Sequence, residues 1–334
     1  MMALRGLGDR MIAARAMGGA LLLAGLAAPW VASEYVLSVL IVSLWFAYVG
    51  QAWNIMMGFA GQLSLGHAMY VGLGAYAAAG LFVFTGIGPW LGAPLAVIVA
   101  VIAGAGIGWL GFRFQVKGVY FALLTIAFAE FTRILFDHIT VLGGSGGLFL
   151  PVGQRSGVDL INLRGGPVMF YYVIFVMTVA ITALSWALLR TRLGYQWQAI
   201  REDAEAAEAV GVPVFRTKLL AVMLSAGLTA LGGVFFAFYY NTLFPEQIFA
   251  KSRSIEMILA PIIGGMGTVL GPLVGALLLT PLGELTMAVI AGLGVTNAGV
   301  RQVVFGVLLI LVLWFLPQGV WPWLTQRWAK GRRQ

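Results

Sequence analysis

The chain contains no cysteine and only two histidines, and charged residues make up 10% of its 334 positions. The absence of cysteine excludes disulfides and thiolate metal ligands. His67 and His138 are far apart in sequence and do not form a multi-histidine metal centre, so we expect neither a metal nor a cofactor. Soluble domains carry about 25% charged residues. A chain this poor in charge requires lipid, rather than water, around most of its surface.

Sequence signatures of catalysis are also missing. The chain has no G-x-x-x-x-G-K-[ST] phosphate-binding loop, no G-x-S-x-G nucleophile elbow and no H-E-x-x-H zinc motif. It therefore cannot hydrolyse ATP alone, and we do not expect an enzyme. The net charge of +8 would suit nucleic acid, but the cations lie at the ends of apolar runs. That pattern is typical of membrane orientation, so we expect no nucleic-acid partner.

Hydrophobic residues make up 61% of the chain and occur in long runs. A membrane-spanning helix needs about 20 predominantly apolar residues. We therefore predict an all-α polytopic membrane protein that forms one transmembrane domain over residues 1–334. The predicted spans are 18–33, 35–57, 63–85, 91–112, 118–138, 168–189, 217–240, 254–280 and 299–316. A shorter apolar piece at 285–296 is either a tenth span or a re-entrant segment.

The first apolar run follows three arginines and resembles a signal peptide, with residues 31–33 as a possible cleavage site. A second apolar run follows directly, so we favour a first helix that is retained. Placing the N-terminus in the cytoplasm puts most lysines and arginines on the inner side, as the positive-inside rule requires. Both termini are then cytoplasmic. The number of spans is even, and about ten helices cross if 285–296 does.

Two glycine-rich segments interrupt the predicted spans, and the first reads GFAGQLSLGHA over residues 58–68. Irregular backbone at membrane depth survives only where protein or a water-filled cavity surrounds it. We interpret the segment as a broken or tightly packed helix beside a translocation path, with Gln62, Ser64 and His67 as candidates to line that path. The alternative is a close helix contact in which Ser64 and His67 bond to backbone carbonyls.

The second segment reads GGMGTVLGPLVG over residues 264–275. Pairs of glycine-interrupted segments, one in each half of a chain, point to a transporter's path, and we therefore name Gly264, Gly265 and Gly267 as path candidates. The alternative is a helix-packing stripe, because glycines spaced four apart from Gly267 share one helical face. Pro272 is predicted to kink the helix.

Charged residues within a predicted span form one small group. Glu130, Arg133 and Asp137 are spaced three and four apart, so all three can meet on one helical face. They form either a polar lining near the outer mouth or an ion pair that stabilises the bundle. Glu256 begins another span from the outside, close to Lys251, where an acid at a helix N-terminus is favourable.

The loop 190–218 is too long for a plain connector between spans. Its acidic residues are Glu202, Asp203, Glu205 and Glu208. We predict a short exposed cytoplasmic helix of about three turns, closed by Gly211 and stopped by Pro213. Membrane-surface helices are usually rich in Lys and Arg, so this acidic helix favours a docking surface that includes Arg201 and Glu202. The alternative is an amphipathic helix lying on the membrane.

Within that loop, Glu205-Ala206-Ala207 followed by Gly211 resembles the E-A-A-x-x-x-G loop of bacterial ABC importer permeases. Longer stretches are similar to the high-affinity branched-chain amino-acid (Liv) permeases. They are 58–68, 117–130, 143–148 and 254–268. The resemblance covers roughly residues 40–317 and is strongest to the M-type subunit of that family.

The resemblance implies a type II-like ABC importer permease fold in a bacterial inner membrane. It implies a homologous second permease subunit, two cytoplasmic ATP-binding subunits and a periplasmic or extracellular substrate-binding protein as partners. Glu205, Ala206, Ala207 and Gly211 would then form the coupling helix that docks into an ATPase groove. The expected function is import of branched-chain amino acids, although the same family includes permeases for urea and short amides.

A secondary transporter is the rival from another class. It should show paired ionisable residues at mid-membrane, where only the off-centre Glu130 and Arg133 qualify, and it needs no acidic cytoplasmic helix.

Overall fold

The computed structural model describes residues 25–151, 159–292, 303, 306–307, 310, 314–316 and 318–331. Within these ranges nearly all regular structure is helical. The strands there are β1 (Leu148–Phe149) and β2 (Thr242–Leu243), which pair antiparallel. The predicted all-α polytopic fold is confirmed.

Six of the described helices are long and apolar enough to cross a membrane. They are α2 (Glu34–Asn54) with the π-helical turn η1 (Ile55–Phe59), α3 (His67–Thr85), α4 (Pro89–Arg113), α5 (Val119–His138), α6 (Pro167–Leu188) and α9 (Val214–Tyr240). Each lies within a few residues of a predicted span. The predicted spans 18–33 and 299–316 fall largely outside the described residues, although 25–31 is helical and lies against α6 through Tyr171, whose hydroxyl donates to the Gly25 carbonyl at 2.7 Å.

The predicted span 254–280 is wrong as a single helix. The chain forms α11 (Lys251–Gly265), breaks, and resumes as α12 (Gly271–Gly292). Residues 285–292 of the uncertain segment 285–296 continue α12 rather than forming an element of their own. Pro272 lies in the first turn of α12, where a missing N–H is harmless, and so it does not kink a helix interior.

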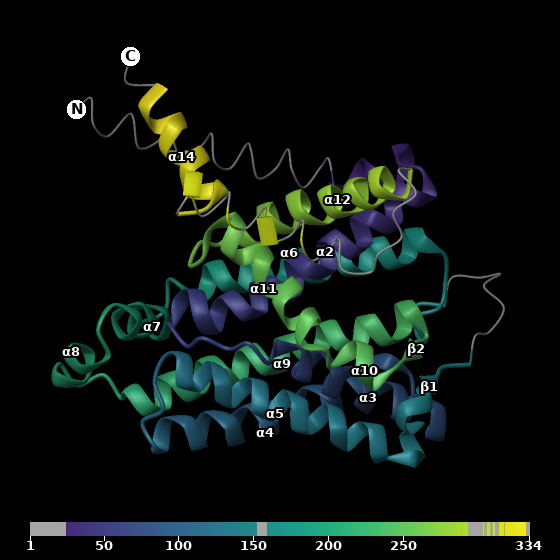
Figure 1. Cartoon of the computed structure of the whole chain (residues 1–334), viewed down its shortest axis with the longest axis horizontal. Coiled ribbons are helices and arrows are strands. Elements are labelled where there is room, and N and C mark those ends of the chain that lie inside the picture. The colour runs from purple at the N-terminus through teal and green to yellow at the C-terminus, as the bar shows by residue number, and fades with distance from the viewer. Residues whose placement is uncertain are drawn as a thin grey trace.

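Shorter helices complete the described fold. They are α7 (Arg192–Glu202), α8 (Ala204–Ala209), α10 (Pro245–Ile248), α14 (Val320–Gly331) and the 3-10 turns Thr140–Leu142 and Gly144–Gly146. In Figure 1, α7 and α8 project from one end of the bundle, and β1 and β2 lie at the opposite end.

The core is built around α2, α3 and α9, which are the most buried of the six long helices, whereas α4, α5 and α6 lie further out. Small residues let α3 and α9 approach closely. A Cβ added at Gly74 would collide with the Ala230 carbonyl, and one at Gly233 would collide with the Val71 carbonyl. This close contact holds α3 and α9 together at the centre of the bundle.

Candidate functional site

The first helix break lies between α2 and α3. The π-helical turn η1 ends at Phe59, and residues 60–66 are not helical. Gly61 has a φ of +69°, a conformation that favours glycine. The break is held by side chains of neighbouring helices, because Trp53 Nε1 donates to the Ser64 carbonyl at 2.8 Å and the Leu65 N–H donates to Thr125 Oγ1 at 3.1 Å. The segment is therefore an irregular connection between α2 and α3, and its place beside a translocation path stays a prediction.

His67 begins α3 and is fully buried. Its Nδ1 lies 3.0 Å from Ser64 Oγ, and its Nε2 lies 2.9 Å from Ser225 Oγ on α9. The Ser225 hydroxyl donates to the Ala52 carbonyl at 2.8 Å, so it accepts from His67 Nε2–H. A neutral ring then accepts at Nδ1 from the Ser64 hydroxyl. The expectation that Ser64 and His67 bond to backbone carbonyls is wrong, because both partners of the ring are hydroxyls.

Gln62 lies within the same break and is half-buried. Its side-chain amide donates to the Ala60 carbonyl at 2.8 Å. Of the three polar path candidates in this segment, Ser64 and His67 have no exposed surface, whereas Gln62 keeps some. Their contact with a transported solute stays a prediction.

The second break lies between α11 and α12. Gly265 and Gly267 have φ values of +125° and +77°, and the Thr268 hydroxyl closes the turn by donating to the Gly265 carbonyl at 2.7 Å and accepting from the Gly271 N–H at 3.0 Å. A Cβ at Gly264 would collide with the Gly271 carbonyl. This segment is thus both a break and a tight helix–helix contact. The predicted stripe on one helical face is wrong for Gly267, which lies in the break before α12, and a place beside the solute path stays a prediction.

Asn54 joins the two breaks. It is the last residue of α2 and is fully buried. Its Nδ2 donates to the Thr268 carbonyl at 2.9 Å, and its Oδ1 accepts from the Gly267 N–H at 2.8 Å. Sequence reasoning did not identify Asn54. An amide side chain inside an apolar span is the available signal, because such groups need a partner in the membrane.

Arg201 of α7 reaches the same junction. Its Nη1 donates to the Gly58 carbonyl at 2.6 Å. The stem of its side chain packs on Gly61, and Nη1 lies against Gly267, so a Cβ at either glycine would meet it. The carbonyl of Gly58 lies at the end of a helix, where intrahelical donors run out. Arg201 therefore contacts both breaks, and its role in docking an ATPase stays a prediction.

The α7–α8 hairpin (residues 192–209) replaces the single three-turn helix that the sequence predicted. Asp203 separates the two helices because its carboxylate accepts from the backbone N–H groups of Glu205 and Ala206, at 2.9 and 3.0 Å, and so caps α8. Gly211 has a φ of +89° and ends α8, as expected.

Trp197 attaches the hairpin to the bundle. Its ring is fully buried, and its Nε1 donates to the Thr217 carbonyl of α9 at 2.9 Å. Among the predicted docking residues, Ala207 is buried, whereas Glu202, Glu205, Ala206 and Gly211 are exposed. Lys117 Nζ lies 3.1 Å from Glu205 Oε1, but both side chains are mostly exposed, so this pair adds little stability.

The charged group at the other end of α5 forms the predicted ion pairs. Arg133 lies 2.7 Å from Glu130 and 2.8 Å from Asp137, and Lys251 at the start of α11 lies 3.9 Å from Glu130. Glu256 pairs with Arg253 at 3.6 Å. In this conformation Glu130 is engaged with cations, as the bundle-stabilising interpretation requires.

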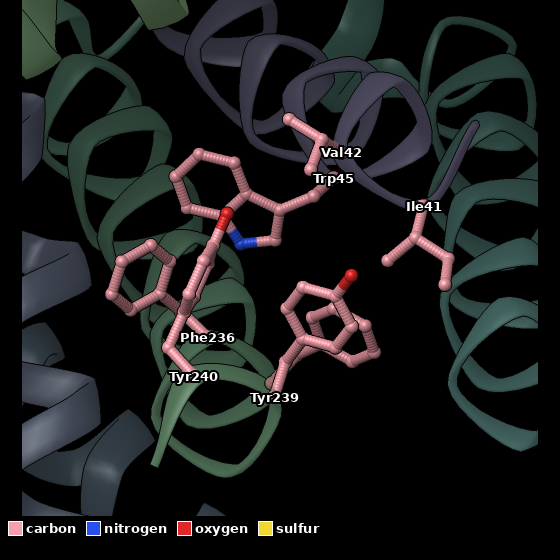
Figure 2. Close-up of a pocket in the computed structure, with 7 residues that line it drawn as sticks. Ile41, Val42, Trp45, Phe236, Tyr239 and Tyr240 are labelled. Atoms are coloured by element: carbon pink, nitrogen blue, oxygen red, sulfur yellow. The ribbon is translucent and has the colours of Figure 1, made fainter. Parts of the chain in front are cut away.

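The described residues contain no group of three or more His, Cys, Asp or Glu side chains that could hold a metal ion. Figure 2 shows an aromatic pocket in which Trp45 and Ile41 of α2 approach Phe236 and Tyr239 of α9. Its volume is about 10 Å³, about the space for one water molecule. Side chains rather than solute fill this part of the bundle.

A helical membrane bundle with two joined helix breaks and an exposed hairpin that contacts them has the features of a transport permease. A family model described as "branched-chain amino acid transport system / permease component" matches residues 35–313. The chain belongs to this permease family.

The names of individual relatives agree with this family assignment. The chain is 28% identical over 325 residues to the high-affinity branched-chain amino acid transport system permease protein LivM of Escherichia coli K12, covering 91% of this chain and 74% of the relative. It is 24% identical over 286 residues to LivH of Salmonella typhimurium LT2, covering 82% and 90%. It is 22% identical to the probable LivM of Methanocaldococcus jannaschii, covering 84% and 92%. No solved structure matches the chain.

Proposed function

We propose that the chain is a membrane-spanning permease subunit of an ABC importer that moves branched-chain amino acids into the cell. The observation that carries this proposal is the Arg201 contact. An exposed acidic hairpin outside the bundle is hydrogen-bonded, through one side chain, to the junction of both helix breaks inside it. The names of the LivM and LivH relatives support the substrate class.

The proposed orientation places the α7–α8 hairpin in the cytoplasm of a bacterial cell, at the inner membrane. Arg113, Lys117, Arg190 and Arg192 all lie at helix ends on the hairpin side of the bundle, and cytoplasmic loops carry the excess of Lys and Arg. Both termini are then cytoplasmic.

The proposed energy source is a pair of cytoplasmic ATP-binding subunits, because the chain lacks a phosphate-binding loop of its own. The exposed Glu202, Glu205 and Gly211 are the surface for that contact, together with Ala206. When ATP closes the ATPase pair, α7 moves and Arg201 shifts with it. The Gly58 carbonyl then loses its donor, and leaving such a group unpaired costs about 1–3 kcal/mol. The breaks therefore rearrange with α7, which is how ATP closure reopens the path.

The remaining partners are a homologous second permease subunit and a periplasmic or extracellular substrate-binding protein. The solute is proposed to pass between this chain and the second permease. Selectivity for the solute then resides mainly in the binding protein. Within the first break, Gln62 is the polar path candidate that keeps exposed surface for contact with the solute.

The test is ATPase activity of the purified complex, reconstituted with a binding protein carrying leucine, urea or nothing. We expect stimulation by the leucine-loaded protein alone. Stimulation of ATPase activity by the urea-loaded binding protein alone would change the proposed substrate from branched-chain amino acids to urea. A chain that never co-purifies with ATPase subunits would refute the importer. Disrupting Glu205 and Gly211 together should abolish stimulation, and normal transport by that variant would refute the docking surface.

A further inference from the structure

A groove of about 710 Å³ lies between α2, α6, the second break, α12 and α14. This volume falls within the 300–1,000 Å³ typical of sites for small organic ligands. Its walls include Leu44, Phe175, Val179 and Leu270, with the indoles of Trp186 and Trp321.

The groove offers almost no hydrogen bonds to an occupant. Its two hydroxyls are already engaged with their own helix, because Thr178 donates to the Ile174 carbonyl at 2.8 Å and Thr182 donates to the Thr178 carbonyl at 2.7 Å. A zwitterionic or amide solute would lose its water partners and gain none in return. A hydrocarbon chain has no hydrogen bonds to lose there, so the groove is a site for an apolar chain.

One guanidinium group lies beside an indole that lines this groove. Arg190 follows α6, and its guanidinium carbon stands 3.6 Å from the ring centroid of Trp186. Within the part of the chain that the structure describes, no carboxylate pairs with Arg190. A guanidinium stacked on a ring keeps its N–H donors in plane for an anion.

We propose that this groove binds an anionic phospholipid, with an acyl chain along α6 and the phosphate at Arg190. The apolar walls match the chain, and Arg190 matches the phosphate, which guanidinium groups bind in a bidentate manner. Tryptophan belongs at the level of the headgroups. In the proposed orientation this end faces the cytoplasmic leaflet, where anionic lipid attracts basic groups.

The bound lipid would contact the second break, which rearranges with α7 in the proposed mechanism. Val269 and Leu270 belong to the second break and line the groove, while α14 rests on that break because a Cβ at Gly319 would collide with Gly265. A bound acyl chain therefore packs against the same segment that Asn54 holds from the other side. The inference concerns lipid binding alone and does not depend on which solute is carried.

The test is lipid binding to the purified full-length chain, measured by native mass spectrometry with phosphatidylglycerol or phosphatidylcholine added after delipidation. We expect tighter binding of phosphatidylglycerol. Arg190→Gln should weaken it about fivefold, since one cation near an anionic lipid surface contributes about 1 kcal/mol and 1.4 kcal/mol is tenfold. Arg113→Gln, at the exposed end of α4, is the matched control and should bind as the unmodified chain does.

A groove-filling variant tests the acyl-chain part. Val179→Trp places a large ring in the groove and should abolish tight lipid binding. Val176→Trp is its control, because it adds the same ring to α6 at a position that is 63% exposed and does not line the groove. The control should bind lipid as the unmodified chain does. Equal binding of the two lipids, unchanged binding by Arg190→Gln, or full binding by a folded Val179→Trp protein would each overturn the proposal. Absence of any tightly bound lipid would overturn it too, since another part of the protein would then cover the groove.

Discussion

Replacing Arg201 by alanine should uncouple ATP hydrolysis from transport. The change removes the 2.6 Å hydrogen bond to the Gly58 carbonyl and the packing of the side-chain stem on Gly61. Hydrogen bonds to charged groups contribute about 1.5–3 kcal/mol. The Arg201 side chain is 39% exposed, which favours the lower figure of about 1.5 kcal/mol. The pair with Glu202 is exposed and adds little.

A loss of about 1.5 kcal/mol corresponds to roughly a tenfold change in an equilibrium. If α7 and the breaks move together through this bond, the alanine variant should lose about tenfold in solute moved per ATP hydrolysed. Basal ATPase activity should persist, because the exposed acidic surface of α8 is untouched. The assay is parallel measurement of ATP hydrolysis and solute uptake in proteoliposomes.

Arg192→Ala is the matched control. Arg192 begins the same helix, is exposed and makes no side-chain contact with either break. It should leave the coupling ratio unchanged, and Arg201→Lys, which keeps the charge but not the planar fork, should be intermediate. An Arg201→Ala protein with the normal ratio and a normal melting temperature would refute this reasoning, as would an equal loss in Arg192→Ala.

Three further changes test the junction and the α7–α8 hairpin. Asn54→Ala should lower the free energy of unfolding by about 2 kcal/mol, because it leaves the Gly267 N–H and the Thr268 carbonyl without their partner. Thermal melting measures this loss, and an unchanged melting temperature would contradict the prediction. Gly267→Ala should destabilise by about 1–2 kcal/mol because its φ of +77° disfavours a Cβ, whereas Gly106→Ala, with nothing within 4 Å, should not. Lys117→Glu should change stability by less than about 1 kcal/mol, since its pair with Glu205 is exposed.

Local rules predicted much of this structure. The apolar runs located α2 to α6 and α9 within a few residues, because in lipid every backbone group must bond within its own helix. The spacing of Glu130, Arg133 and Asp137 predicted their ion pairs, which form as expected. Gly211 ends α8 with the left-handed conformation that its position after an alanine-rich stretch indicates.

The departures arise where one residue serves two segments. Asp203 has weak helix propensity, and its carboxylate caps a new helix and divides α7 from α8. Hydropathy predicts a continuous span through Gly265, because it does not register a turn closed by the Thr268 hydroxyl.

Long-range partners are the part that the sequence could not provide. Asn54 and Thr268 are 214 positions apart, and Arg201 and Gly58 are 143 apart. No periodicity links such residues, so only the fold reveals that the hairpin and the two breaks meet. The polar residues themselves were visible in the sequence, and Arg201 was named for the hairpin surface rather than for this junction.

The decisive measurement is leucine uptake by proteoliposomes that contain the chain with its partner subunits and a leucine-loaded binding protein. We predict uptake only when ATP is present on the side of the α7–α8 hairpin, with no response to an imposed proton or sodium gradient. Uptake that follows an ion gradient in the absence of ATP would contradict the importer mechanism and identify the chain as a secondary transporter.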